Sequence, residues 1–319
     1  MGELSLLKLF RERAPGHRWV RVGPGHDAAI VEWKQDRDLA FKIDAIVEGV
    51  HFVLEGDGAA TPEQAGWKAV ARAISDIAAV GFEPVAITAA VSLRGDLKEE
   101  VAVRLFDGMT DCCKRFGCAL AGGDLSSTRG PLTVAVSAIG EGPRGGAFLR
   151  KGASPGDALF VTGELGGSLA GRHLSFVPRV AEARKLRALG VVRAMTDISD
   201  GLARDLRHLC EESGVGAVLE EAALPVSADA YAQAFRRKRP VMDCVLGDGE
   251  DYELLFAVSG RDAGRLAKEW NLPVRLTRIG WFVAPEKGML LCRADGTVVP
   301  LPDVGYEHLS SGKGEGKGR

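Results

Sequence analysis

Six short acidic motifs, most of them beside glycines, hold the side chains in this sequence that could do chemistry. Each motif places a carboxylate at or near the end of an expected strand or helix. If the fold gathers these carboxylates, their charge needs bound cations to balance it. Oxygen ligands of this kind suit Mg²⁺, which usually binds together with substrate phosphates, so the motifs favour phosphoryl transfer from a nucleotide. The motifs are 25–29, 42–44, 74–76, 122–124, 197–201 and 249–253.

Strands and helices interleave along the 319 residues, which predicts a mixed α/β (α+β) fold of two domains. The glycine- and proline-rich stretch 140–155 is the best boundary. We expect an N-terminal domain at 1–150, a C-terminal domain at 151–309 and a disordered tail without an apolar anchor at 310–319. Strands are expected at 27–33, 39–47, 85–93, 132–141, 157–162, 216–222, 253–258, 275–283 and 288–294. Helices are expected at 63–80, 98–116, 178–189, 201–213, 226–236 and 261–270.

Composition argues against several classes of function. The net charge is −2, so no overall basic field attracts nucleic acid. No apolar run approaches the ~20 residues of a membrane-spanning helix. Six cysteines occur without a CxxC pair or a histidine at zinc-ligand spacing, which is typical of reduced cysteines in a cytoplasmic protein. A Walker A loop, the common protein-kinase signatures and a GxSxG nucleophile elbow are all missing from the sequence.

Asp76 stands among apolar residues of the helix expected at 63–80. A buried, unpaired carboxylate costs several kcal/mol, so a buried Asp76 needs a cation, a hydrogen-bond donor or water. The alternative is that Asp76 is an exposed residue next to Arg72.

The motif at 197–201 precedes the helix expected at 201–213. Ser199 or Asp200 could simply cap the N-terminus of that helix. A cap needs only one of these residues, and Asp197 adds a second carboxylate three residues before Asp200. The pattern therefore also fits a helix N-terminus that holds a metal ion and a phosphate.

Three other positions allow a purely structural interpretation beside a functional one. Gly123 follows a strand expected at 118–121, and it would let the backbone approach a phosphate closely or would belong to a plain turn before Asp124. Glu250 stands in a turn whose paired acids could be solvated. His51 follows a strand, and a lone histidine is more often structural.

Taken together and in order, these motifs resemble the thiamine-monophosphate kinase family, which belongs to the aminoimidazole-ribonucleotide-synthetase-like superfamily. The similarity runs from residue 2 to residue 308, nearly the whole chain. Each motif alone is weak, but six of them in order at plausible spacing are specific. The most specific stretches are 44–52, 67–81, 197–202 and 249–254.

The resemblance implies ATP-dependent transfer of the γ-phosphoryl group onto the phosphate of thiamine monophosphate, which gives thiamine diphosphate. It also implies a two-domain fold and a homodimer built on the N-terminal sheets. Two phosphate-bearing anions need positioning and charge neutralisation more than a strong base, so we assign no general base. By motif, Mg²⁺ ligands are expected at Asp27, Asp44, Asp76, Asp124, Asp197 and Asp200. ATP contacts are expected at Gly123, Asp124, Arg150 and Ser199, and thiamine-phosphate contacts at His51, Glu250 and Tyr306.

Three residues depart from the pattern of this family. His26 stands where the family usually has an aspartate, and Lys42 and Ile43 stand where it usually has two hydroxyl residues. The change amounts to one fewer carboxylate and one more cation near the site. It predicts fewer or weaker Mg²⁺ sites than is typical, and less strongly an altered substrate or lost activity.

Two alternatives stay open. The first is a related ATP-using enzyme of the same superfamily with another substrate, although the diagnostic cysteines of the selenophosphate and hydrogenase-maturation enzymes are not found here. The second is a degenerate nucleotide-binding or dimerisation protein without catalysis. His26, Lys42 and Ile43 favour it, whereas the retained aspartates oppose it, because a site without function gains nothing from gathering acids.

Overall fold

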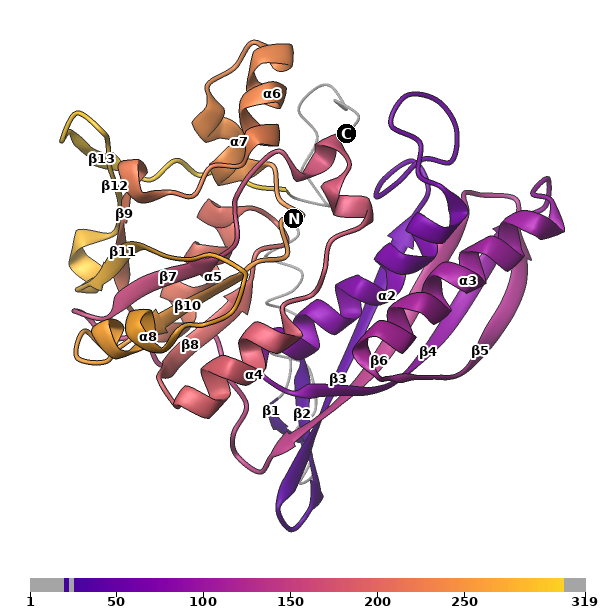
Figure 1. The fold of residues 1–319 in the computed structure, drawn as a ribbon, viewed down its shortest axis with the longest axis horizontal. Helices are drawn as coiled ribbons and strands as arrows, with labels where there is room; N and C mark the ends of the chain where they lie inside the picture. Colours follow the sequence, from indigo (N-terminus) through magenta and orange to yellow (C-terminus); the bar gives the residue numbers. More distant parts are fainter. Residues whose placement is uncertain (1–19, 23–25, 307–319) are drawn as a thin grey trace.

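The first half of the chain folds into a six-stranded sheet (Figure 1). The computed structural model describes residues 20–22 and 26–306, so the tail expected at 310–319 lies outside the described residues. The strands are β1 (Val20–Val22), β2 (Ala29–Lys34), β3 (Arg37–Val47), β4 (Glu83–Arg94), β5 (Ala119–Thr128) and β6 (Thr133–Pro143). Their order in the sheet is β1-β2-β3-β6-β4-β5, and neighbours are antiparallel except β4 and β5, which are parallel.

Two helices pack against one face of this sheet, which we call the inner face; the opposite side is the outer face (Figure 1). They are α2 (Pro62–Ala79) and α3 (Glu99–Phe116). α2 begins with a capping box, in which the Thr61 hydroxyl accepts a hydrogen bond from the Gln64 amide and the Gln64 side chain accepts one from the Thr61 amide. Ala40 of β3 and Val136 of β6 are fully buried on the inner face, and the residues next to each of them in its strand point to the outer face.

Two glycines let α2 and α3 approach each other closely. A Cβ added at Gly108 of α3 would lie 1.9 Å from the Glu63 carbonyl oxygen, and one added at Gly66 of α2 would lie 2.0 Å from the Leu105 carbonyl oxygen. Both distances are far below van der Waals contact. The crossing of these helices, and hence the position of α2, therefore depends on glycine at both positions.

The second half of the chain folds into a seven-stranded mixed sheet. Its strands are β7 (Ala158–Thr162), β8 (Val192–Asp197), β9 (Gly216–Glu220), β10 (Leu254–Val258), β11 (Leu276–Val283), β12 (Met289–Cys292) and β13 (Val298–Pro300). Their order is β13-β12-β9-β11-β7-β10-β8. The helices are α4 (Val180–Leu189), α5 (Leu202–Ser213), α6 (Ala228–Arg237), α7 (Val241–Gly247) and α8 (Ala263–Glu269). Single 3-10 turns are η1 (Ser168–Ala170), η2 (Arg172–Leu174), η3 (Glu221–Ala223) and η4 (Pro285–Lys287).

Strand β10 is buried on both faces and separates two hydrophobic cores. Leu254 and Phe256 belong to a core that continues into α2 and the first sheet. Leu255 and Ala257 belong to a second core with α5, α6 and α7. An unbroken apolar run is what a strand covered on both sides requires.

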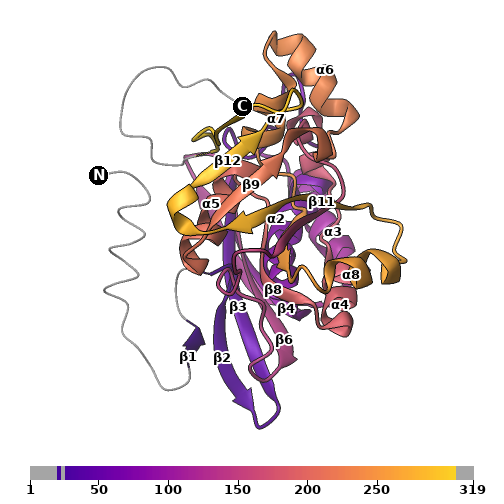
Figure 2. The same cartoon turned by 90° about the vertical axis from the view of Figure 1, so that its left-hand side faces the viewer.

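Helix α2 lies between the two sheets (Figure 1, Figure 2). It contacts β3, β4 and β6 on one side and β8, α4 and η2 on the other. The Trp67 indole N–H donates to the Phe176 carbonyl oxygen across this junction at 2.8 Å. Residues on α2 are therefore placed to work with residues of both halves.

The mixed α/β fold expected from the sequence is confirmed, and all the expected strands and helices are present, most with ends within two residues. β1, β8, α7 and β13 were not expected, and β5 runs on to Thr128, well beyond the strand expected at 118–121. β8 is short and contains Arg193, so its apolar pattern is weak. It lies at the edge of the sheet, where its place depends on pairing with β10. The stretch 140–155 does connect the two sheets, while the division at residue 150 stays a prediction.

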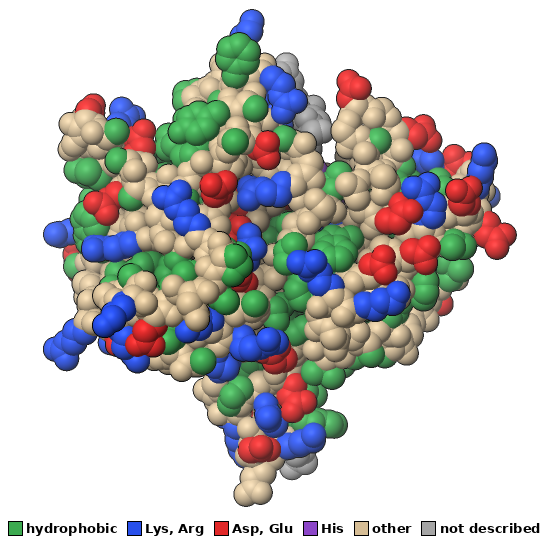
Figure 3. Space-filling view, in the orientation of Figure 1, with side chains coloured by type: hydrophobic (Ala, Val, Ile, Leu, Met, Phe, Trp, Pro, Cys, Tyr) green, Lys and Arg blue, Asp and Glu red, His purple; other side chains and the backbone are tan. Residues whose placement is uncertain are grey.

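None of the described helices is long and apolar enough to cross a membrane. On the face of the molecule shown in Figure 3, acidic and basic side chains are interspersed. This distribution matches the net charge of −2 and leaves no field of a single sign on that face.

Candidate active site

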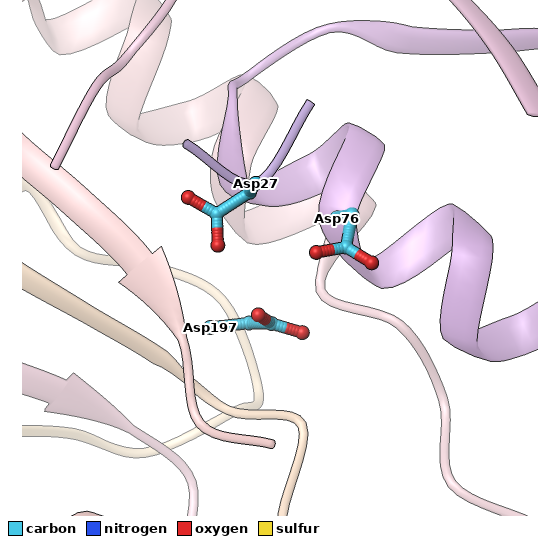
Figure 4. A group of neighbouring side chains, drawn as sticks. All are labelled: Asp27, Asp76 and Asp197. Carbon is cyan, nitrogen blue, oxygen red and sulfur yellow. The ribbon is translucent and has the colours of Figure 1, made fainter. Parts of the chain in front are cut away.

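Three aspartates meet where the two halves of the chain join (Figure 4). Asp27 precedes β2, Asp76 lies on α2 and Asp197 ends β8. All three are buried, and one oxygen of each lies within 4.8 Å of the others. In the part of the chain that the structure describes, they are the one group of three His, Cys, Asp or Glu side chains close enough to hold a metal ion. We call these three residues the acidic centre.

The environment of the acidic centre penalises negative charge. Burial, together with the charges of neighbouring aspartates, raises the pKa of Asp76 well above its usual range. Burial and the charge of Asp27 raise the pKa of Asp197 to about 6. Buried carboxylate oxygens that repel one another are a donor set that suits a hard divalent cation such as Mg²⁺. The residues present therefore fit the metal expected from the sequence.

Arg150 partly neutralises the acidic centre. Its Nη2 donates to Asp27 Oδ1 at 2.9 Å and its Nε to Asp27 Oδ2 at 3.2 Å, and the Thr196 hydroxyl donates to Asp27 Oδ1 at 2.8 Å. Burial alone would raise the pKa of Asp27, but Arg150 outweighs it and lowers this pKa below its usual value. The residue expected to contact a nucleotide thus contacts one of the expected metal ligands.

Lys42 reaches the acidic centre from β3. Its Nζ lies 3.0 Å from Asp76 Oδ2 and 3.6 Å from Asp44 Oδ1. Burial alone would lower the pKa of Lys42, yet Asp44 and Asp76 raise it above its usual value. Asp44 is therefore next to the acidic centre and is joined to it through the Lys42 ammonium group.

The turn before α5 differs from the expected cap. The N-cap residue is Gly201, and neither Ser199 nor Asp200 caps the helix through its side chain. The backbone amides of Ser199 and Asp200 instead each donate to Asp205 Oδ2 at 3.0 Å. The capping interpretation is thus corrected, because a carboxylate within the helix accepts from these amides first. Burial and the charge of Asp200 raise the pKa of Asp205 well above its usual range.

A second turn packs directly against this one. The Glu250 amide donates to the Ser199 carbonyl oxygen at 2.7 Å, and the Tyr252 amide donates to the Ile198 carbonyl oxygen at 2.7 Å. Glu250 and Tyr252 adopt left-handed backbone conformations with φ of 57° and 51°. Non-glycine residues rarely hold such angles without support from their surroundings, and they gather at functional sites.

Lys68 joins three expected or potential site residues in one buried cluster. Its Nζ donates to Glu250 Oε2 at 2.7 Å and to the His51 carbonyl oxygen at 2.6 Å. The same Nζ lies 2.8 Å from His173 Nδ1, which lies 3.0 Å from Glu250 Oε2. Lys68 is fully buried. The structure therefore brings together His51 and Glu250, two of the three residues expected to contact thiamine phosphate.

Tyr306, the third of these residues, lies beside the turn before α5. Its backbone amide donates to the Asp200 carbonyl oxygen at 2.9 Å. Its backbone is therefore anchored near an expected metal ligand.

Gly123 and Asp124 lie within strand β5, so the turn considered for them does not form. Gly123 pairs with Ala89 and faces the inner side, in the same cross-strand row as Asp44. Asp124 pairs with Ala90 one residue later, so its side chain points to the outer face. Within the chain, the structure does not bring Asp124 to the other expected ligands. A metal-binding role for Asp124 would need a site on the outer face.

Lys68 and His173 were not expected at the site from the sequence. A signal for Lys68 was available, because Lys68, Arg72, Ser75 and Asp76 form a polar stripe at helical spacing on an otherwise apolar helix. Each member contacts the site: Arg72 Nη2 lies 3.9 Å from Asp44 Oδ1, and the Ser75 hydroxyl donates to Asp197. His173 lies in the single turn η2 and has no such pattern.

Comparison with known proteins places this architecture in a class. Residues 25–141 match the N-terminal domain of AIR synthase related proteins, and residues 154–292 match the C-terminal domain of the same proteins. Two matched domains, one for each sheet, define the chain as an AIR synthase related protein.

Comparison over nearly the whole chain finds more specific relatives. The thiamine-monophosphate kinase of Rhodopirellula baltica is 38% identical over 88% of this chain and 89% of its own. The thiamine-monophosphate kinase of Escherichia coli strain K12 is 34% identical over 97% of this chain and 99% of its own. A solved structure of AaThiL complexed with AMPPCP and TMP superposes with a TM-score of 0.82 at 28% identity, covering 97% of each chain. The chain belongs to the thiamine-monophosphate kinase family.

Proposed function

We propose that this protein transfers the γ-phosphoryl group of ATP to the phosphate of thiamine monophosphate. An oxygen of the acceptor phosphate attacks the γ-phosphorus, and the bond from that phosphorus to the β–γ bridging oxygen breaks as ADP leaves with the electron pair. The product is thiamine diphosphate. The kinases named above and a relative of known structure that holds AMPPCP and TMP support this reaction.

The acidic centre is the observation that carries the proposal. Three buried carboxylates from separate segments meet at the junction of the two halves, and burying charges so close together is costly unless a cation binds there. Bound Mg²⁺ would neutralise charge on the phosphates and on the transferring group. Asp27, Asp76 and Asp197 would hold it, and Asp200 stands at the adjacent helix N-terminus.

The Lys68 cluster is the proposed place of the acceptor. Glu250 and His173 offer polar atoms that are already held in place by the buried Lys68 ammonium. Preorganised groups lower the entropy cost of binding and orient the acceptor phosphate for attack. No residue needs to act as a general base, because a phosphate oxygen is already an anion.

We also propose a homodimer formed through the outer face of the first sheet. This face exposes apolar side chains, with Ile43 67% and Phe41 39% exposed. Exposed apolar groups on one sheet face are typical of an interface. Asp124 points to the same face, so a second copy is also the proposed route by which Asp124 could meet a nucleotide.

A cytoplasmic location is part of the proposal. All six cysteines are free, and five of them are buried. Free, buried cysteines are typical of proteins kept in a reducing compartment.

The test is an assay of purified protein with ATP, Mg²⁺ and thiamine monophosphate, with thiamine diphosphate separated by chromatography. We expect product that requires both ATP and the metal. Absence of product, with ATP binding still measured by calorimetry, would reject this acceptor and favour a different one or a role in binding alone.

A further inference from the structure

The Lys42 ammonium group occupies a position that a metal ion would otherwise compete for. Lys42 leaves β3 on the inner face opposite Ala138, which is fully buried, and its side chain is 23% exposed. Its Nζ lies 3.0 Å from Asp76 Oδ2 and 3.6 Å from Asp44 Oδ1. A Mg²⁺ ion needs carboxylate oxygens at about 2.0–2.1 Å, so it cannot bridge these two oxygens while the ammonium group is there.

The two basic side chains at the site pair with different carboxylates. Arg150 binds Asp27, whereas Lys42 binds Asp76 and Asp44. Asp197 accepts a hydrogen bond from the Ser75 hydroxyl and lies within 4.8 Å of Asp27 and Asp76. These three carboxylates would therefore hold a divalent ion without Asp44.

We propose that Lys42 is a tethered cation that takes the place of one divalent ion between Asp44 and Asp76. The acidic centre then binds its remaining divalent ions through Asp27, Asp76 and Asp197. Asp44 holds Lys42 in place and is not itself a metal ligand in this protein. The inference rests on the proposed function only in assuming that divalent ions bind at this site.

The first experiment counts Mn²⁺ ions bound to each protomer by electron paramagnetic resonance, without nucleotide. Lys42→Met should bind one more ion than the wild type, or bind Mn²⁺ at least about tenfold more tightly, because a positive charge near the carboxylates is gone. Lys34→Met removes a charge from an exposed residue of β2 and should match the wild type. The same number of ions and the same affinity in Lys42→Met and wild type would overturn the proposal.

Thermal unfolding supplies an independent measurement on the same variants. In EDTA, Lys42→Met should melt below the wild type, because Asp44 and Asp76 then repel each other without compensation, and added Mg²⁺ should restore the midpoint. A midpoint of Lys42→Met that is unchanged in EDTA and unaffected by Mg²⁺ would contradict the proposal.

A second pair of variants tests the inference if Lys42→Met does not fold. Asp44→Asn should leave the number of bound Mn²⁺ ions unchanged, whereas Asp197→Asn should lose at least one. Loss of an ion in Asp44→Asn would make Asp44 a ligand and reject the proposal.

Failure of the proposed function is separable from failure of this inference. Mn²⁺ counting needs neither ATP nor thiamine monophosphate. A wild-type protein without kinase activity that gains an ion in Lys42→Met would reject the function and keep the tethered cation, and an active kinase without that gain would do the reverse.

Discussion

At Asp76, the stability of the fold and the proposed function make opposite demands. It is buried beside Asp27 and Asp197, and its raised pKa shows that the fold disfavours its charge. Asp76→Asn removes this repulsion, so the thermal midpoint in EDTA should stay the same or rise. Turnover should fall by about a hundredfold or more, because a ligand for the charge-neutralising cation is lost.

Asp107→Asn is a matched control for this prediction, since Asp107 is an exposed residue of α3 outside the site. It should leave turnover unchanged. Activity in Asp76→Asn equal to that of Asp107→Asn would remove Asp76 from the proposed metal site. Calorimetric scans in EDTA and steady-state rates in Mg²⁺ provide the two measurements.

Lys68 is the residue whose removal should cost the most stability. Its ammonium group is fully buried and compensates the Glu250 carboxylate at 2.7 Å. Lys68→Met leaves that carboxylate buried without its cation, which should lower the free energy of unfolding by about 3–5 kcal/mol. Urea titration measures the loss.

The double variant Lys68→Met with Glu250→Gln tests whether this loss comes from the ion pair. Neutralising Glu250 should recover part of the stability lost in Lys68→Met, so the two changes should not be additive. Strict additivity would mean that Lys68 contributes through packing alone.

At the scale of elements, the site depends on where α2 lies. The polar stripe of α2 contacts Glu250 at one end and Asp197 at the other, so a shift of the helix would misplace both groups. Its position is set by the close crossing with α3. The placement of the site residues on α2 thus depends on two glycines outside the site.

Gly108→Ala should test this dependence. The added methyl would lie 1.9 Å from the Glu63 carbonyl oxygen, so the helices must separate, at a cost of about 1–3 kcal/mol. Activity should fall together with stability, since α2 carries Asp76. Gly264→Ala in α8 is the control, because nothing lies within 4 Å of the added Cβ. A Gly108→Ala protein as stable and active as Gly264→Ala would show that the crossing tolerates a shift.

At the scale of the whole molecule, the outer face of the first sheet is the proposed dimer interface. Ile43→Glu places a charge on its exposed apolar surface and should convert the dimer to a monomer. Val103→Glu changes an exposed apolar residue of α3, on the inner side, and should leave the mass unchanged. Light scattering after gel filtration measures both. A wild-type protein that is monomeric at micromolar concentration would reject the interface.

Much of the fold follows from local patterns in the sequence. Most strands and helices were expected within two residues because apolar periodicity, capping residues and turn glycines are local signals. β8 was not expected because its pattern is weak and its place depends on pairing with β10. The acidic motifs likewise identified Asp27, Asp76 and Asp197 by residue type before their positions were known.

What the tertiary structure alone decided is which of these residues meet. Lys68 and Glu250 are 182 residues apart, and no local pattern encodes their contact. Asp124 and Gly123 are neighbours in sequence, yet strand pairing turns them to opposite faces of the sheet. The sequence specifies the residue types and their order, so by itself it determined the chemistry that is available and the class of protein. Distances between charges arise only from strand register and helix packing, so the structure decided that Lys42 lies between Asp44 and Asp76 and that Asp124 lies apart.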